Sequence, residues 1–320
     1  MLSEVIIMLS KKQMRKLIRS VYGANTEYGK QIEQLYRRAN RQIQGEISAF
    51  ISSRANWSGK PSRADLEDIR QQLIEANEQS VAPLVAVYLS SVTLGHPKNG
   101  DVETARIALP MIKVAKQMHH VMNRQQQRIP RKVSQISQEQ HAITPEIHRI
   151  PINYNTMLQR EVSQSVTQRQ SPTSLINRDI QSTVSRIQDV AKQASTSEET
   201  SIDWVKKIDR ILTGHKLRGG ASKKAQRIIR TESCRELNGS TIGDFKARGV
   251  KKYRFLSLES SNSCKGCTHM DGNVYAVEDA EEGVNLPPMH PSCQCWIVEY
   301  EDDDTDDMPT GSEMDIDEDS

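Results

Sequence analysis

The residues best suited to chemistry lie near the C-terminus, where Cys264-x-x-Cys267 is followed after 22 residues by His290-x-x-Cys293-x-Cys295. A C-x-x-C turn directs two thiolates at one centre, about 2.3 Å from a zinc ion, and a second short Cys/His motif completes a tetrahedron. In a reducing cytoplasm, clustered cysteines beside a histidine indicate a metal before a disulfide. We therefore predict a structural Zn²⁺ site.

The motif offers five candidate ligands for four positions. In an extended segment Cys293 and Cys295 point to one side and His290 points to the other, unless a tight turn at Pro291 reverses it. The favoured ligands are Cys264, Cys267, His290 and Cys293. Cys295 is the alternative.

Other chemistry for these cysteines has less support. No thioredoxin-like βαβ pattern surrounds them, as a redox dithiol would require. A catalytic zinc needs an open position and a nearby acid or base. His269 and Asp271 lie near in sequence, but no H-E-x-x-H or H-x-E motif is present. We expect Cys234, which stands alone on a helix, to be an ordinary buried thiol.

The elements around the motif predict a small α+β module at 221–298. A helix over 223–237 ends at Asn238-Gly239, a strand follows around Tyr253–Leu258, and Asp271-Gly272-Asn273 forms a hairpin with the segment after it. Gly214–Ala221 lacks the Lys-Ser/Thr of a phosphate loop, so we expect no nucleotide site there.

The rest of the chain has the apolar periodicity of helices. We predict a helical domain over 1–123, with a break near Gly23–Thr26, and a helical segment over 156–220. Between them, 124–155 contains Pro130, Pro145 and Pro151 and is predicted to be a flexible linker. No window has the ~18 apolar residues of a membrane span. The fold class is mainly α, with an elongated helical N-terminal part and a zinc-stabilised α+β module.

Composition argues against a compact single-domain enzyme. Hydrophobic residues make up 36% of the 320 residues and aromatic residues only 4%. Such a chain has little to build one deep core, so we expect it to complete its burial against a partner.

The formal net charge of +2 hides two opposite segments. Residues 299–320 carry 12 acids and no Lys or Arg, which predicts a disordered acidic tail. Residues 206–254 carry 15 Lys/Arg and four acids, which suits DNA or an acidic protein surface. We expect the tail to mask this basic segment when no partner is present. The predicted contact residues are Lys223, Lys224, Arg227, Arg230, Arg235, Lys251 and Lys252.

The stretch 225–296 resembles the C-terminal domain of phage Mu F-like minor head proteins, also called head morphogenesis proteins. The matching residues come in the family's order: Ile229-Arg230-Thr231-Glu232, Asn238, Gly249, Cys264-x-x-Cys267, Asp271-Gly272, Tyr275 and Pro287-Pro288-x-His290-Pro291-x-Cys293-x-Cys295. The family commonly has Arg where this chain has Gln294. Some relatives lack the cysteine pair, so metal binding rests on the residues of this chain.

The resemblance implies a low-copy virion protein that helps to build the head at the portal vertex and contacts packaged DNA non-specifically. Its partners would be the portal protein and other head proteins, and its location the virion head, after assembly in the host cytoplasm. We expect no enzymatic activity, no membrane contact and no small-molecule substrate. The alternatives are a metal-dependent nuclease using His269, Asp271 and His290, and a free DNA-binding regulator.

Overall fold

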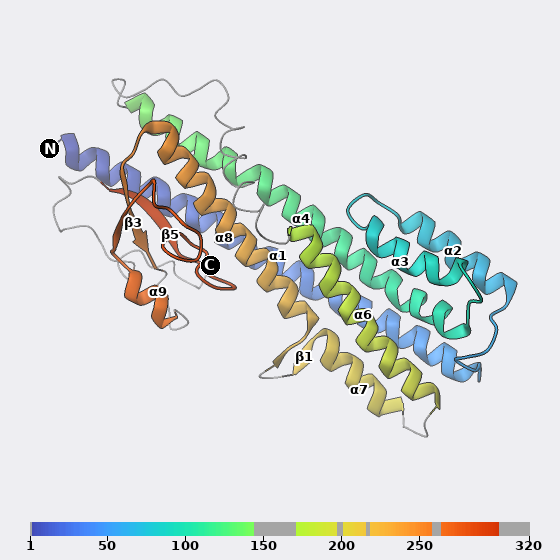
Figure 1. Ribbon diagram of the computed structural model, residues 1–320. Coiled ribbons are helices and arrows are strands. Elements are labelled where there is room, and N and C mark those ends of the chain that lie inside the picture. The colour runs from blue at the N-terminus through green and yellow to red at the C-terminus, as the bar shows by residue number, and fades with distance from the viewer. Residues whose placement is uncertain (1, 144–170, 197–200, 216–217, 258–263, 301–320) are drawn as a thin grey trace. The chain divides into compact units, whose positions relative to one another are not determined.

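The computed structural model describes residues 2–143, 171–196, 201–215, 218–257 and 264–300 (Figure 1). The helices within these ranges are α1 (Leu2–Ser52), α2 (Arg63–Ala76), α3 (Ala82–Thr93), α4 (Asn99–Ile143), α6 (Pro172–Thr196), α7 (Ser201–Leu212), α8 (Ala221–Arg248) and α9 (Lys265–Met270). The strands are β1 (Gly214–His215), β2 (Arg218–Gly219), β3 (Lys252–Leu256), β4 (Val274–Ala276) and β5 (Trp296–Tyr300). The predicted class, mainly α with a small sheet near the C-terminus, is confirmed.

The C-terminal sheet has three antiparallel strands in the order β4-β3-β5. Its central strand pairs Tyr253 with Tyr275 on one side and Phe255 with Ile297 on the other. A sheet of this size is marginal by itself and needs a packed face. The short β1–β2 ribbon between α7 and α8 was not foreseen.

Contacts divide the chain into two units that are interleaved in sequence. One unit, called here the sheet unit, contains residues 1–27, 122–170 and 227–320. The other, called here the helical unit, contains 28–121 and 171–226. Because α1, α4 and α8 each contribute residues to both units, the domain boundaries predicted as consecutive stretches of sequence do not describe this division.

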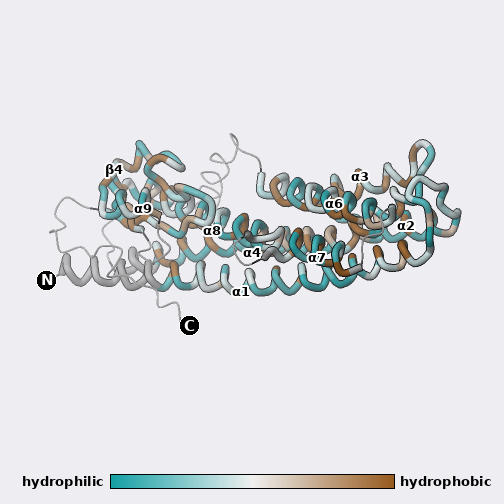
Figure 2. Tube along the Cα trace, turned by 90° about the horizontal axis from the view of Figure 1, so that it is seen from below, coloured by the Kyte–Doolittle hydropathy of each residue, from teal (hydrophilic) through white to brown (hydrophobic). Residues whose placement is uncertain are grey.

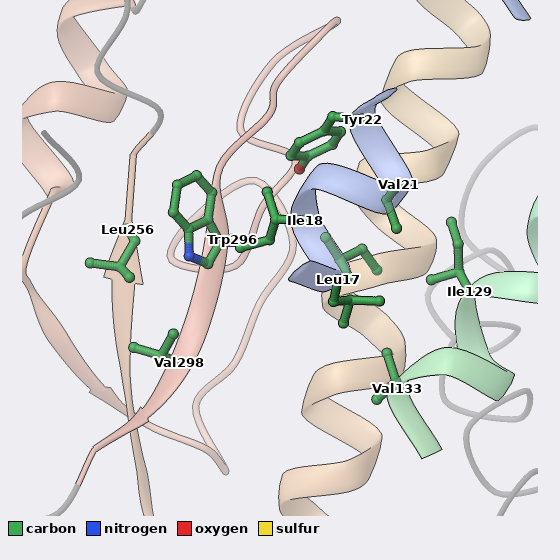
Figure 3. Close-up of a cluster of buried hydrophobic side chains, with 10 residues drawn as sticks. Leu17, Ile18, Val21, Tyr22, Ile129, Val133, Leu256, Trp296 and Val298 are labelled. Carbon is green, nitrogen blue, oxygen red and sulfur yellow. The ribbon is translucent and has the colours of Figure 1, made fainter. Parts of the chain in front are cut away.

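The core of the sheet unit joins the N-terminal part of α1, the C-terminal part of α4, α8 and the sheet. Figure 3 shows side chains of α1 and α4 facing those of β3 and β5. The cluster consists of Leu17, Ile18, Val21, Tyr22, Ile129, Val133, Leu237, Leu256, Trp296 and Val298. Burying aliphatic side chains from segments so far apart in sequence supplies most of the drive for this packing.

A buried polar contact also joins α1, α4 and α8 within this unit. Asn25 Oδ1 accepts hydrogen bonds from Gln125 Nε2 at 2.9 Å and from Ser233 Oγ at 2.9 Å. All three residues are buried. Because an unpaired polar group is costly in the core, this arrangement favours one register of α1, α4 and α8.

The helical unit packs amphipathic helices, and the traces of α1, α4 and α6 alternate between hydrophilic and hydrophobic colours in Figure 2. The predicted N-cap is confirmed, because the Ser62 side chain accepts the backbone N–H of Asp65 at 3.0 Å. In the core, His119 Nε2 lies 3.0 Å from Asn177 Oδ1, and Asn177 Nδ2 donates to the Ser80 carbonyl at 3.2 Å. None of the described helices is long and apolar enough to cross a membrane.

Three boundaries expected from the sequence were wrong. Helix α1 runs through Gly23–Thr26 without a break. Residues 124–143 continue α4 instead of starting a linker, because Ile129 and Val133 extend its buried stripe past Pro130. The rest of the predicted linker, 144–155, lies outside the described residues, as do 156–170 and the tail after Tyr300.

Helix α8 also continues past Asn238-Gly239, where an end was predicted. The Asn238 side chain is fully buried, and its Nδ2 donates to the Cys234 carbonyl at 2.9 Å. Asn disfavours the interior of a helix because its side chain, when it has no other partner, forms hydrogen bonds with nearby backbone groups that the helix needs. Here it has partners within the helix and beyond it, so the helix continues to Arg248.

The buried carboxyl of Glu103 generates a prediction for the helical unit. Glu103 is 1% exposed, and its Oε1 has no hydrogen-bond partner among the described residues. Burial, together with the charge of Glu46, raises the pKa of Glu103 to about 8, although Arg106 opposes this. The folded state therefore holds a proton that the unfolded state releases near pH 4.5, so stability falls as pH rises from about 4.5 to 8.

Glu103→Gln is expected to remove this slope and to stabilise the protein at pH 8 by on the order of 2 kcal/mol, with little effect at pH 4. Denaturant unfolding at pH 4, 6 and 8 measures it. Glu46→Gln, at an exposed position on α1, is the matched control and should shift stability much less. An unchanged pH slope in Glu103→Gln would show that Glu103 is ionised in the folded protein.

Candidate metal centre

The first cysteine pair is shaped by the short helix α9. Cys264 is the N-cap residue of this helix, and its Sγ accepts the backbone N–H of Cys267 at 3.2 Å. Both thiols are therefore held on one turn of chain. After α9, Gly272 has φ 78° and its N–H donates to the Phe255 carbonyl at 2.9 Å, which attaches the turn to β3.

The second motif is a tight turn, as the ligand prediction required. The Cys293 N–H donates to the His290 carbonyl at 3.1 Å, and Ser292 has φ 66°. Its N–H donates in turn to Thr231 Oγ1 of α8 at 2.9 Å. The turn brings His290 and the two following cysteines to the same side of the chain.

The five candidate ligands form two groups that share Cys267. Cys264, Cys267 and His290 make one group, and Cys267, Cys293 and Cys295 make the other. Within each group the ligand atoms lie within 4.8 Å of one another. Tetrahedral coordination by thiolates at about 2.3 Å places neighbouring sulfurs ~3.8 Å apart. Either group can hold a metal ion with small side-chain adjustments, and Cys267 belongs to every such arrangement.

The thiols are electrostatically coupled. Burial is the largest influence on Cys264 and opposes its ionisation, but the hydrogen bonds from Cys267 and the charge of His290 together lower the pKa of Cys264. Hydrogen bonds from the thiols of Cys234, Cys267 and Cys295 lower the pKa of Cys293. The same contacts raise the pKa of Cys267 and of Cys295, because a second thiolate next to the first is unfavourable. A bound cation would offset this repulsion and allow several thiolates together.

Three residues outside the motif position its second half. The carbonyl of Cys295 accepts hydrogen bonds from Tyr22 Oη at 3.2 Å, Asn238 Nδ2 at 3.1 Å and Cys234 Sγ at 3.5 Å. Cys234 is buried, as predicted, and belongs to neither metal group. Asn238 stands in the family motif, but no local spacing pointed to Tyr22, more than 270 residues away.

The alternative catalytic residues are not assembled with the ligands. Neither His269 nor Asp271 belongs to the metal-binding groups found among the described residues. His269 is exposed on α9, and Asp271 Oδ1 accepts the Ser257 N–H at 2.6 Å. The geometry thus keeps Asp271 in a structural contact between α9 and β3.

The predicted basic contact residues do not behave as one set. Lys223 and Lys224 belong to the helical unit, whereas the other five belong to the sheet unit. Arg235 is only 13% exposed and forms ion pairs with Glu232 and Glu282, the latter at 2.9 Å. We correct its assignment as a surface contact residue, because two buried carboxylates already neutralise it. Lys224 pairs with Asp179 at 3.6 Å.

Comparison with known proteins gives a family match for part of the chain. Residues 185–298 match the model of the family described as phage Mu protein F like protein. This segment covers about a third of the chain and contains the entire metal centre. Residues 185–298 are therefore a phage Mu F-like region, and the match supports a role in head morphogenesis. No curated protein and no solved structure matches it.

The shared position of Cys267 generates a prediction about the metal. Freshly purified, reduced protein is expected to contain about one metal ion per chain. Cys267→Ser should lose it, because both groups need this thiol, and Cys264→Ala should lose or strongly weaken it. Metal analysis and thermal unfolding with and without a chelator measure both effects, and chelation should destabilise the wild type and not Cys267→Ser.

Cys234→Ala is the matched control, since it removes a neighbouring buried thiol outside both groups and should keep the metal. His290→Ala and Cys295→Ser then show which of these two candidates is a ligand, because a variant that lacks a ligand loses the metal. Wild-type protein without any bound metal would disprove the site.

Proposed function

We propose that this chain is a structural, non-enzymatic minor head protein of a tailed phage, which joins the head at the portal and is stabilised there by Zn²⁺. The family match over residues 185–298 carries the proposal. The head is accordingly its expected location, and the portal and other head proteins are its expected partners, met in the host cytoplasm during assembly.

The donor set supports zinc as the metal. Thiolate and imidazole ligands suit Zn²⁺ better than Mg²⁺ or Ca²⁺, which prefer oxygen. A structural zinc is closed by four protein ligands, and the five candidates lie in two groups of three that share Cys267. The ion would hold α9 and the second motif against β3 and α8, which a three-stranded sheet needs for stability.

Features of the helical unit support a protein contact. Helix α3 and its flanks, residues 79–97, have no charged side chain other than His96. Val87 is 42% and Leu94 70% exposed on this stretch, and Ile74 of α2 is 55% exposed. An uncharged helix with exposed aliphatic side chains is typical of surfaces that become covered by another protein.

Head association is tested in cells that assemble heads with the cognate portal protein. The chain is expected to co-sediment with heads on a density gradient and to be captured with the portal. Cys267→Ser should reduce its incorporation several-fold, because the zinc-stabilised module unfolds. Cys234→Ala should be incorporated normally.

Removing the chain should leave heads that lack a component or fail to mature. If heads form and package DNA normally without it, and it stays at the top of the gradient, the proposed role is wrong.

A further inference from the structure

Two helices of the sheet unit carry an unusually one-sided charge. The segment 5–26 of α1 contains five Lys/Arg and no Asp or Glu. The part of α4 that belongs to this unit contains four Lys/Arg and no Asp or Glu over residues 122–138. The two helices pack through Leu17, Ile129 and Val133 (Figure 3). Lys16, Arg128 and Lys132 therefore lie on one helix pair.

Two of the cations converge on one small hydroxyl. Arg128 Nη2 donates to Ser20 Oγ at 2.7 Å and to the Ser20 carbonyl at 3.3 Å. Lys132 Nζ donates to the same Oγ. Burial and the charges of Arg128 and Lys16 lower the pKa of Lys132, so Lys16 also lies within electrostatic reach. Among the described residues, none of the three forms an ion pair with a carboxylate.

This arrangement differs from three other partly buried arginines of the described chain. Arg106 pairs with Asp65 at 2.6 Å, Arg235 with Glu282 at 2.9 Å and Arg248 with Glu299 at 2.7 Å. Arg70 donates instead to the Val92 carbonyl, and Arg254 lies over the Tyr300 ring, so neither stands beside a second cation as Arg128 and Lys132 do. The cluster around Ser20 places like charges together instead, which is unfavourable unless an anion joins them.

We propose that Lys16, Ser20, Arg128 and Lys132 bind a phosphate group of the duplex DNA backbone. Arg, Lys and Ser side chains are typical phosphate contacts, and they position a protein on DNA without reading its sequence. The proposal goes beyond the role in head assembly and does not depend on it. It also differs from the basic segment 206–254, where Arg235 is already neutralised.

A polyanion fits the surroundings of the cluster better than a single ion does. Arg19 directly precedes Ser20 in the chain, and Arg131 directly precedes Lys132. Both arginines are exposed. They extend the positive charge along the helix pair beyond the three cations that one phosphate would satisfy. Successive phosphates of one strand can therefore meet successive cations, and each contact releases counterions.

The test measures binding of the full-length protein to a fluorescent duplex of random sequence at several salt concentrations. Ser20→Asp places a carboxylate where Arg128 and Lys132 donate, so it should raise the melting temperature and weaken DNA binding together. Loss of two phosphate contacts should reduce the slope of log K against log salt by about 2. A merely structural role for Ser20 would not change the slope.

Lys132→Gln gives a second reading if Ser20→Asp does not fold, and should reduce the slope by about 1. Lys113→Gln is the matched control, because Lys113 is exposed on the same helix but belongs to the helical unit. It should leave binding unchanged.

Three results would overturn the proposal. One is DNA binding that Ser20→Asp and Lys132→Gln change no more than Lys113→Gln does. Another is tighter binding to polyglutamate of equal charge, which would assign the cluster to an acidic protein. The third is saturation by inorganic phosphate with no binding of the duplex.

Discussion

One buried carbonyl oxygen, that of Cys295, links the parts of the sheet unit. It accepts hydrogen bonds from Tyr22 of α1 and from Cys234 and Asn238 of α8. A buried acceptor without partners is costly, so the metal-binding turn, α8 and the N-terminal helix constrain one another. The next residue, Trp296, is 1% exposed and begins β5 in the core. The same few residues therefore end the metal motif and anchor the sheet.

Helix α8 is the element that most of these contacts use. Its Thr231 holds the turn at Ser292, its Cys234 lies beside the cysteine cluster and its Leu237 enters the core. A chain with few aromatic residues builds this core mainly from aliphatic stripes on long helices. That solution explains why α1, α4 and α8 are longer than the patterns predicted, since each must supply buried surface over many turns.

Among the described residues, the basic side chains include some in buried ion pairs and others without a carboxylate partner. Arg235 and Arg248 lie against carboxylates, so these two cations of the segment 206–254 are already paired inside the fold. The cations around Ser20 have no such partner among the described residues. The net charge of residues 206–254 therefore overestimated the number of cations available there for a partner. It also gave no sign of the cluster around Ser20, because ion pairing depends on segments distant in sequence.

The sequence by itself determined the ligand types, the helical class and the family. Thiolate chemistry, C-x-x-C spacing and apolar periodicity act over a few residues, and the structure places the five candidate ligands in two groups that share Cys267. Tertiary structure decided the rest. Residues 124–143 are helical because distant apolar side chains cover Ile129 and Val133, and α8 passes Asn238 because that side chain has buried partners. Tyr22 reaches Cys295, and Arg128 and Lys132 meet at Ser20, only because α1 packs against segments far along the chain. Local patterns cannot encode these contacts, since their free energy comes from burying groups that are neighbours in space alone.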